Sequence, residues 1–344
     1  ASARRLSTAD VTLGNLHFLL LHLRWQIIGL AVLFTASLLS KELARRTGIV
    51  VAGAMLFLLM LVPVLGTEVN GARRWLNLGV SLQPSEFLKP GFAVLVAWIL
   101  SWRARDPKLP VIGISAALMI LVGGLLMLQP DFGATMLFSA VWFALVLLSG
   151  LAVRRIAILG ALGVSAVVAA YMLYDNARHR IDAFIGGGTA FDQVDLAQRT
   201  LLTGGWTGTG FWLGSRKMAL PEAHTDYILS VIGEEFGLIA CAIIILLYLA
   251  IVVRVILRLV GEEDLFTVLA GTGLAAQLGG QAFINILVNL QLFPSKGMTL
   301  PLISYGGSST VALCLGVGLL LAITRRNPFI RREGFSLRDT GARP

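Results

Sequence analysis

The amino-acid sequence predicts an all-α polytopic membrane protein, for three reasons. The 344-residue chain is 56% hydrophobic and only 14% charged, which is too apolar for a soluble globular protein. Its apolar residues gather in runs long enough to cross a bilayer, separated by polar segments. These runs lack the period-two alternation of membrane strands, so we expect a helical bundle and exclude a β-barrel.

Nine apolar runs predict nine transmembrane helices in a single membrane domain covering residues 1–344. The runs lie at about residues 18–40, 49–65, 87–102, 111–128, 132–149, 156–174, 227–253, 265–292 and 308–323. The helix over 87–102 should start early, because Pro84 to Glu86 are typical of a helix start, and Pro90 should bend it. The tripeptide Gln129-Pro130-Asp131 predicts a tight hairpin in which Asp131 caps the next helix.

Basic residues predict the orientation of the bundle. Sixteen of the 28 lysines and arginines lie in alternate loops and the tail, at residues 41–46, 103–108, 154–155, 254–258 and 325–343. The positive-inside rule assigns these segments, and the tail 325–344, to the cytoplasm, so the long loop 175–226 is extracytoplasmic. Within that loop we expect a short amphipathic helix over residues 192–202. Because the first 17 residues then lie outside, we infer a missing first span, with an N-out protein as the alternative.

The same patterns exclude two function classes. The net charge of +9 comes from basic pairs between apolar runs and forms no continuous basic stripe, so nucleic acid is not an expected partner. Cys241 and Cys314 both lie inside apolar runs, where they are typical of small core residues. We therefore expect no disulfide, cysteine metal site or redox pair.

Asp226 is the candidate catalytic residue. It ends the polar stretch Pro221-Glu222-Ala223-His224-Thr225-Asp226, at the boundary between the long loop and the next apolar run. A carboxylate at that boundary can remain ionised beside a substrate that is half lipid and half polar. The alternative is that Asp226 and Thr225 merely cap the helix that follows.

Basic residues on the predicted outer side indicate an anionic ligand. Arg73, Arg74, Lys89 and Lys296 lie where the positive-inside rule should deplete positive charge. Two helix starts, near Ser85 and at Ser308, would direct free amides toward the same face, and the combination is typical of a pyrophosphate site. Each basic side chain could instead simply snorkel to the interface.

A polar stripe runs along the predicted helix over residues 265–292. Gln277, Gln281, Asn285 and Asn289 recur at intervals of four and therefore share one helix face. Such amides commonly join transmembrane helices by hydrogen bonds, which is the interpretation we favour, and lining of a cavity is the alternative.

Six sequence strings closely resemble the SEDS family (shape, elongation, division and sporulation) of peptidoglycan glycan polymerases. They are NGARRWL, QPSEFLK, LQPDFGAT, LPEAHTDYI, IGEEFGL and PSKGMTLPLISYGGSS, in the family's order over about residues 26–326. A lysine at position 296 makes the sequence resemble the division branch of the family, FtsW, because the elongation branch, RodA, typically has an uncharged residue there. Three features depart from the family: the absent first span, Pro90, and Gln291 in place of a small or apolar residue.

The resemblance implies ten transmembrane helices, of which the first is missing here, and the substrate lipid II. It implies Asp226 as the essential acid. The substrate-binding residues it implies are Arg73, Arg74, Trp75, Glu86, Lys89, His224, Lys296, Ser304 and Ser308. A class B penicillin-binding protein of the FtsI type and other divisome membrane proteins would be partners in the bacterial cytoplasmic membrane. The ligand set for a metal is absent from the sequence, although a divalent cation could assist at the pyrophosphate.

The expected function is therefore an inverting, lipid II-dependent glycosyltransferase that makes glycan strands at the septum. Asp226 would take a proton from the attacking sugar hydroxyl while the cationic residues stabilise the departing pyrophosphate. Three alternatives remain at this point: a lipid II flippase, a RodA-type elongation polymerase, and a scaffold for the division complex. A flippase should show inward-facing polar determinants as well, and the short cytoplasmic loops carry few.

Overall fold

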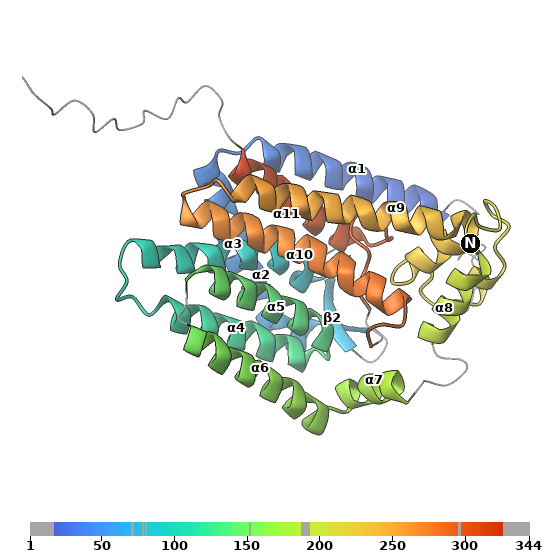
Figure 1. Ribbon diagram of the computed structural model, residues 1–344, viewed down its shortest axis with the longest axis horizontal. Helices are drawn as coiled ribbons and strands as arrows, with labels where there is room; N and C mark the ends of the chain where they lie inside the picture. The colour runs from blue at the N-terminus through green and yellow to red at the C-terminus, as the bar shows by residue number, and fades with distance from the viewer. Residues whose placement is uncertain are drawn as a thin grey trace, which may run out of the picture.

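The computed structural model describes residues 17–69, 72–77, 79, 81–150, 153–186, 193–294 and 297–325. In these ranges, a long helix covers each of the nine apolar runs, and the helices lie side by side in one bundle (Figure 1). They are α1 His17–Ser37, α2 Lys41–Leu65, α3 Pro84–Ser101, α4 Val111–Leu128, α5 Phe132–Leu148, α6 Val153–Leu173, α9 Ile228–Leu259, α10 Leu265–Asn289 and α11 Gly307–Thr324. The predicted helical membrane fold is confirmed.

By length and composition alone, six of the described helices are long and apolar enough to cross a membrane. They are α1, α2, α3, α4, α9 and α11. The apolar parts of α5 and α6, Phe132–Leu148 and Ala157–Leu173, are shorter than these six helices. Helix α10 carries the polar stripe. The count of nine transmembrane helices therefore stays a prediction, whereas the helices themselves are observed.

Several short elements connect the long helices. Helix α7 covers Asp175–Ile185 and α8 covers Gln193–Thr203, and both lie at one end of the bundle (Figure 1). The amphipathic helix predicted over residues 192–202 corresponds to α8. Two single turns of 3-10 helix cover Trp102–Ala104 and Arg216–Met218. Three short strands, β1 Thr67–Val69, β2 Ala72–Asn77 and β3 Ser81–Leu82, form an antiparallel sheet in the order β1-β2-β3 that the sequence analysis did not predict.

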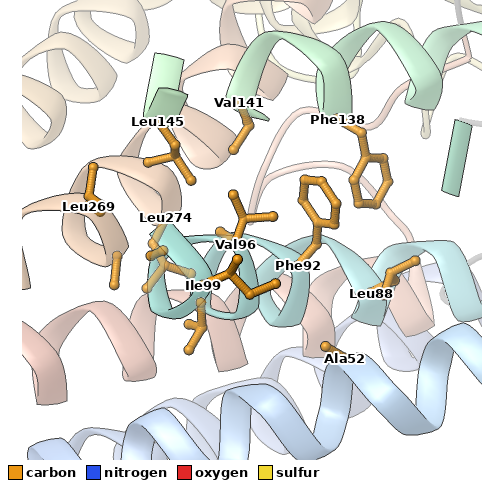
Figure 2. Packing of buried hydrophobic residues seen from close by; sticks show 14 of the residues in the cluster. Ala52, Leu88, Phe92, Val96, Ile99, Phe138, Val141, Leu145, Leu269 and Leu274 are labelled. Carbon is orange, nitrogen blue, oxygen red and sulfur yellow. The ribbon is translucent and has the colours of Figure 1, made fainter. Parts of the chain in front are cut away.

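Helix α3 is the centre of the bundle. Its apolar residues contact α2, α5, α10 and α11, and Figure 2 shows its buried side chains packed between α5 and α2. Phe92 meets Phe138 of α5 edge-to-face, with 5.0 Å between the ring centroids. The helix begins at Pro84, which occupies the first turn as predicted, and Pro90 lies inside it.

Small residues allow the helices around α3 to approach closely. A Cβ added to Gly91 of α3 would lie 2.7 Å from the backbone nitrogen of Ala52 in α2, which is a severe clash. Glycine at such a contact is typical of transmembrane helix pairs, where close backbone packing replaces the hydrophobic driving force. Gly91 therefore fixes the distance between α2 and α3.

The outer faces of the helices are covered by large apolar side chains. Val64 of α2, Ile120 of α4 and Leu246 of α9 are 77%, 74% and 61% exposed. A soluble monomer rarely exposes contiguous apolar patches of this extent. These faces are the surface that contacts lipid.

Helix α9 is interrupted at Gly237, a break that its continuous apolar run did not predict. Gly237 has φ +80° and ψ 176°, so the helical hydrogen bonds cannot cross it. The segment from Gly204 to Gly210 replaces them: the N–H groups of Leu238 and Ile239 donate to carbonyls of the loop, and the N–H groups of Thr209 and Gly210 donate to carbonyls of α9. The Thr209 hydroxyl adds a bond to the Glu234 carbonyl, so the backbone groups at the break are satisfied, as irregular structure near a membrane requires.

Candidate functional site

The polar stripe of α10 organises the candidate site. Gln281, Asn285 and Asn289 are at most 2% exposed, and each amide is hydrogen-bonded to other parts of the chain. Asn289 accepts from the backbone N–H and hydroxyl of Ser230 in α9. The preferred interpretation of the stripe, hydrogen bonding between helices, is confirmed for Gln281, which accepts from Lys89 of α3, and for Asn289. Asn285 bonds to loop carbonyls, and Gln277 Oε1 is buried without a hydrogen-bond partner in the described part of the chain.

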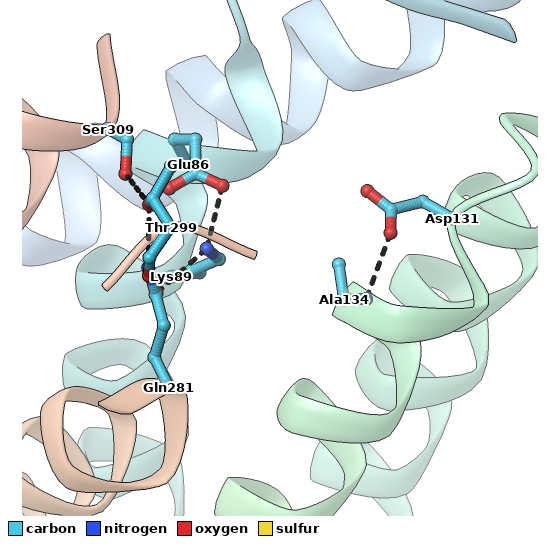
Figure 3. A network of polar contacts seen from close by, with 7 residues as sticks. All are labelled: Glu86, Lys89, Asp131, Ala134, Gln281, Thr299 and Ser309. Atoms are coloured by element: carbon cyan, nitrogen blue, oxygen red, sulfur yellow. Dashed lines mark hydrogen bonds and ion pairs between the residues drawn. The ribbon is translucent and has the colours of Figure 1, made fainter. Parts of the chain in front are cut away.

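One turn of the stripe holds a buried ammonium group. Lys89 Nζ lies 2.7 Å from Glu86 Oε1 and donates to Gln281 Oε1 at 3.0 Å (Figure 3). The Gln281 amide in turn donates to the carbonyl and hydroxyl of Thr299, at 3.0 and 3.2 Å. The Thr299 hydroxyl lies 2.9 Å from that of Ser309, in the first turn of α11. This network, which we call the lysine network, joins the N-terminal half of α3 to the first turn of α11.

The next turn of the stripe holds the backbone of Asp226. Asn285 Nδ2 donates to the Asp226 carbonyl at 2.8 Å and to the Met298 carbonyl at 2.6 Å, and Asn289 Nδ2 also donates to the Asp226 carbonyl, at 3.2 Å. Since Gln281 and Asn285 are four residues apart, consecutive turns of one rigid helix hold the ammonium of Lys89 and the residue that carries the candidate acid.

Asp226 lies in a tight turn that precedes α9. The N-cap position belongs to Tyr227, which makes no side-chain capping bond. The N–H groups of Thr225, Asp226 and Tyr227 all point back to the Glu222 carbonyl, and Glu222 has a positive φ of 53°. The Thr225 hydroxyl donates to the carbonyl and carboxylate of Glu222. A tight turn that contains Thr225 and Asp226 therefore comes immediately before the helix.

The Asp226 carboxylate faces the segment that begins at Gly297. A Cβ added to Gly297 would lie 3.0 Å from Asp226 Oδ2, closer than nearly all real Cβ contacts. Lys296, the neighbouring residue in the sequence, lies outside the described residues, so its predicted role in binding stays a prediction.

Gly297→Ala is expected to displace the Asp226 carboxylate and to reduce catalysis by up to about 100-fold, because a shift of about 1 Å in a reacting group costs that much. Steady-state measurement of glycan synthesis would show the loss. Gly53→Ala is the matched control, since a Cβ there meets nothing within 4 Å. Full activity of the Gly297 variant would show that the position of the Asp226 carboxylate does not depend on the space left by Gly297.

Residues after α10 clamp the Asp226 turn from the other side. Ser304 Oγ donates to the Thr225 carbonyl and accepts from the Leu300 N–H at 2.8 Å. The Tyr305 N–H donates to the His224 carbonyl at 2.9 Å, and the two rings lie 5.7 Å apart. Burial lowers the pKa of His224, although the negative charge of Glu222 acts in the opposite direction. The imidazole is therefore neutral at neutral pH, which suits hydrogen bonding and not anion attraction.

The remaining predicted residues are distributed around this centre. Arg73 is exposed on β2, 3.5 Å from Glu68, and Trp75 is half-buried on the same strand. Arg74 donates to the carbonyls of Gln129 and Pro130 in the turn before α5. In that turn Asp131 caps α5 as predicted, by accepting from the Ala134 N–H at 3.0 Å (Figure 3).

Unlike Ser304, which precedes α11, Ser308 lies in the first turn of that helix. Its hydroxyl is buried at the start of α11 and has no hydrogen-bond partner among the described residues. The structure thus links Glu86 and Lys89 to Thr299 and Ser309 through Gln281. Ser304 contacts the turn that contains Asp226. Arg73 instead contacts Glu68 of β1, and Arg74 contacts the turn between α4 and α5.

Sequence reasoning missed the partners that hold the two charged groups. Thr299 and Ser309 lie in sequence strings that resemble the family, but neither was predicted to contact Lys89 or Gln281. Gln281 and Asn285 were predicted to join helices, without a named partner. The periodic spacing of the amides was the available signal. The sequence does not show which carbonyl each amide reaches, because that depends on the loop from Met298 to Ser304 folding back against α10.

The fold and the buried charged cluster define a multi-pass helical membrane protein with a polar site at one end of its bundle. The chain belongs to the FtsW/RodA/SpoVE family, described as cell cycle protein, whose family model matches residues 2–328. It is 34% identical over 330 residues to a probable peptidoglycan glycosyltransferase FtsW of Caulobacter vibrioides, covering 95% of this chain and 84% of the relative. It is 37% identical over 325 residues to the FtsW of the same description from Aromatoleum aromaticum, covering 89% and 78%.

Solved structures show the same fold. A chain from work described as "Structural coordination of polymerization and crosslinking by a peptidoglycan synthase complex" matches with a TM-score of 0.76 and 31% identity, covering 89% of each chain. The rod shape determining protein RodA of Thermus thermophilus matches with a TM-score of 0.65 and 30% identity, covering 89% of this chain and 87% of that one. Together these similarities confirm the prediction of an FtsW-like peptidoglycan glycosyltransferase.

Proposed function

We propose that this glycosyltransferase polymerises lipid II into septal glycan strands, with Asp226 as the general base. The observation that carries the proposal is the arrangement on α10, whose consecutive turns hold the Asp226 backbone and the buried Lys89 ammonium. A base for the incoming hydroxyl and a cation for the departing diphosphate are the two groups that the reaction requires.

In the proposed reaction, the 4-hydroxyl oxygen of one lipid II attacks the anomeric carbon of the growing strand. The carboxylate of Asp226 accepts the hydroxyl proton as the new carbon–oxygen bond forms. The bond to the polyprenyl pyrophosphate breaks, and the diphosphate leaves with the bonding electron pair. One carboxylate suffices for this single displacement, which inverts the α link of the donor into the β link of the product.

Lys89 supports the leaving group in this proposal. An ammonium group has three N–H donors, and Lys89 uses two of them on Glu86 and Gln281. The third has no partner among the described residues and would donate to a phosphate oxygen. The unpartnered hydroxyl of Ser308, at the N-terminus of α11, is a second donor for the same anion. Arg73, Arg74 and Lys296 would add positive charge farther out, and His224, Trp75 and Ser304 would shape the sugar-binding side.

A divalent cation, where it takes part, would arrive with the pyrophosphate. In the described ranges no three His, Cys, Asp or Glu side chains gather closely enough to hold a metal ion. In the proposed reaction, Lys89 and the helix N-termini stabilise the negative charge of the leaving group.

The proposed setting is the bacterial cytoplasmic membrane, with the Asp226 end of the bundle outside and the C-terminus in the cytoplasm. The structure supports this topology by bringing the predicted cytoplasmic residues Lys41, Arg45 and Arg105 to one shared cavity of about 430 Å³. A class B penicillin-binding protein is the proposed partner, because the similar structure belongs to a complex described as coordinating polymerisation and crosslinking.

Polymerisation in detergent tests the function directly. Purified protein with its transpeptidase partner should convert lipid II into glycan strands in micelles, where no compartments exist. Strand length can be measured by gel electrophoresis of the labelled product. Absence of product in micelles together with lipid II translocation in liposomes would overturn the polymerase in favour of a flippase.

A further inference from the structure

We infer that residues 204–218, here called the aromatic loop, insert into the outer lipid leaflet and anchor the broken end of α9 there. The inference concerns a lipid-binding surface and does not depend on the reaction proposed above. It rests on the exposed side chains of the loop, on their continuity with the lipid-facing side of α9, and on the rigid support beneath them.

The aromatic loop exposes large apolar side chains to an unusual degree. Trp206, Phe211, Trp212 and Leu213 are 74%, 66%, 53% and 73% exposed. The Phe211 and Trp212 rings meet edge-to-face with 5.6 Å between centroids, so these two side chains form one continuous surface. Large apolar surface of this kind marks an interaction site, and tryptophans are enriched where a membrane meets water.

The patch continues the lipid-facing surface of α9. Phe211 lies 6.0 Å from the ring of Phe236, which is itself 47% exposed. The Trp206 carbonyl accepts from the Ile239 N–H at 3.3 Å, so Trp206 lies beside the first exposed residue after the break. Ile239, Ile243 and Leu246 then follow on one helical face, all more than half exposed. This continuity favours lipid over a protein partner as the occupant.

Buried polar groups hold the loop rigidly in this position. The carboxylate of Glu234, which is fully buried, accepts from the backbone N–H groups of Arg216 and Lys217 at 2.7 and 2.9 Å. Lys217 is 2% exposed and forms an ion pair with Glu235. Satisfied buried polar networks of this kind fix a single conformation. The exposed side chains are thus presented by a fixed base, as an anchor requires.

Charge at the base of the patch suits a lipid headgroup. Arg216 is exposed, and its side chain makes no ion pair within the described part of the chain. Next to an inserted aromatic patch, its guanidinium would lie at the level of the lipid phosphates. The anchor would thereby set the depth of the short helical segment 228–236, which begins directly after Asp226 and Tyr227.

The test places a fluorescent probe on the patch of the full-length protein in lipid nanodiscs. Leu213→Cys and, independently, Trp206→Cys are labelled with an environment-sensitive dye. Both native cysteines are buried, and the unsubstituted protein gives the labelling background. Quenching is measured with nitroxide lipids labelled near the headgroup or near the chain end, and with aqueous iodide. Leu246→Cys is the control for lipid and Lys108→Cys the control for water.

Both loop probes should be quenched more strongly by the shallow nitroxide than by the deep one, the reverse of Leu246. Iodide quenching should be several-fold weaker than at Lys108. Two results would overturn the inference: iodide quenching equal to that at Lys108 with no effect of nitroxide lipids, or protection from all three quenchers, which would show that protein covers the patch.

Discussion

Asp226→Asn should abolish glycan synthesis while leaving the fold intact. The amide keeps the size of the side chain, and the backbone carbonyl that Asn285 and Asn289 hold is unchanged. It cannot accept the hydroxyl proton, however, and loss of a general base costs roughly 100- to 10,000-fold in rate. The measurement is the initial rate of lipid II polymerisation by the purified protein with its partner, beside thermal unfolding in detergent.

Glu222→Gln is the matched control for this variant. It makes the same chemical change in the same turn, on an exposed carboxylate whose bond to the Thr225 hydroxyl an amide can keep. Its rate should remain near that of the unsubstituted protein. Near-normal synthesis by the Asp226 variant would show that another group removes the proton.

Lys89→Met should destabilise the protein and stop catalysis. The substitution leaves the carboxylate of Glu86, whose side chain is only 13% exposed, without its ion-pair partner. Breaking a buried pair in this way costs about 3–5 kcal/mol of unfolding free energy. Lys41→Met is the matched control, because the Lys41–Asp264 pair is 45% and 46% exposed and such pairs contribute about 0–1 kcal/mol. Unfolding in detergent would measure both.

A second variant separates the fold from the chemistry. Lys89→Met combined with Glu86→Gln removes both charges, so most of the lost stability should return. Polymerisation should remain absent, because the ammonium that we propose to stabilise the leaving group is still missing. A stable double variant that polymerises normally would assign Lys89 a purely structural role.

The sequence allowed the long helices to be predicted because each consists of an apolar run of spanning length. It also allowed Asp131 to be identified as a cap and the amides of α10 as links between helices. The α9 break escaped prediction, since Gly237 lies in an apolar run and its stabilising bonds come from residues about 30 positions earlier. The sheet that carries Arg73 escaped for a related reason: its strands are only two to six residues long.

The residue types of the candidate site could be predicted from the sequence, but the hydrogen bonds that hold these residues in place could not. Asp226 and Lys89 were selected by residue type and position at the membrane boundary. Capping by Asp226 was an alternative on the same grounds, and residue type alone did not show that Glu222 adopts a left-handed conformation that closes a turn before the helix. Which side chains hold the two groups depended on tertiary folding of residues 298–304, and local pattern carries no information about that.

The way the α9 break is satisfied has a consequence for how this region tolerates sequence change. Every bond between residues 205–210 and α9 is made by main-chain atoms on the α9 side, and four of them by main-chain atoms on both sides. Inserting or deleting one residue there would shift donors out of register with acceptors, whatever the residue type. Homologous chains should therefore keep the length of this segment constant, whereas its side chains, apart from the glycines and the proposed lipid contact of Trp206, can vary.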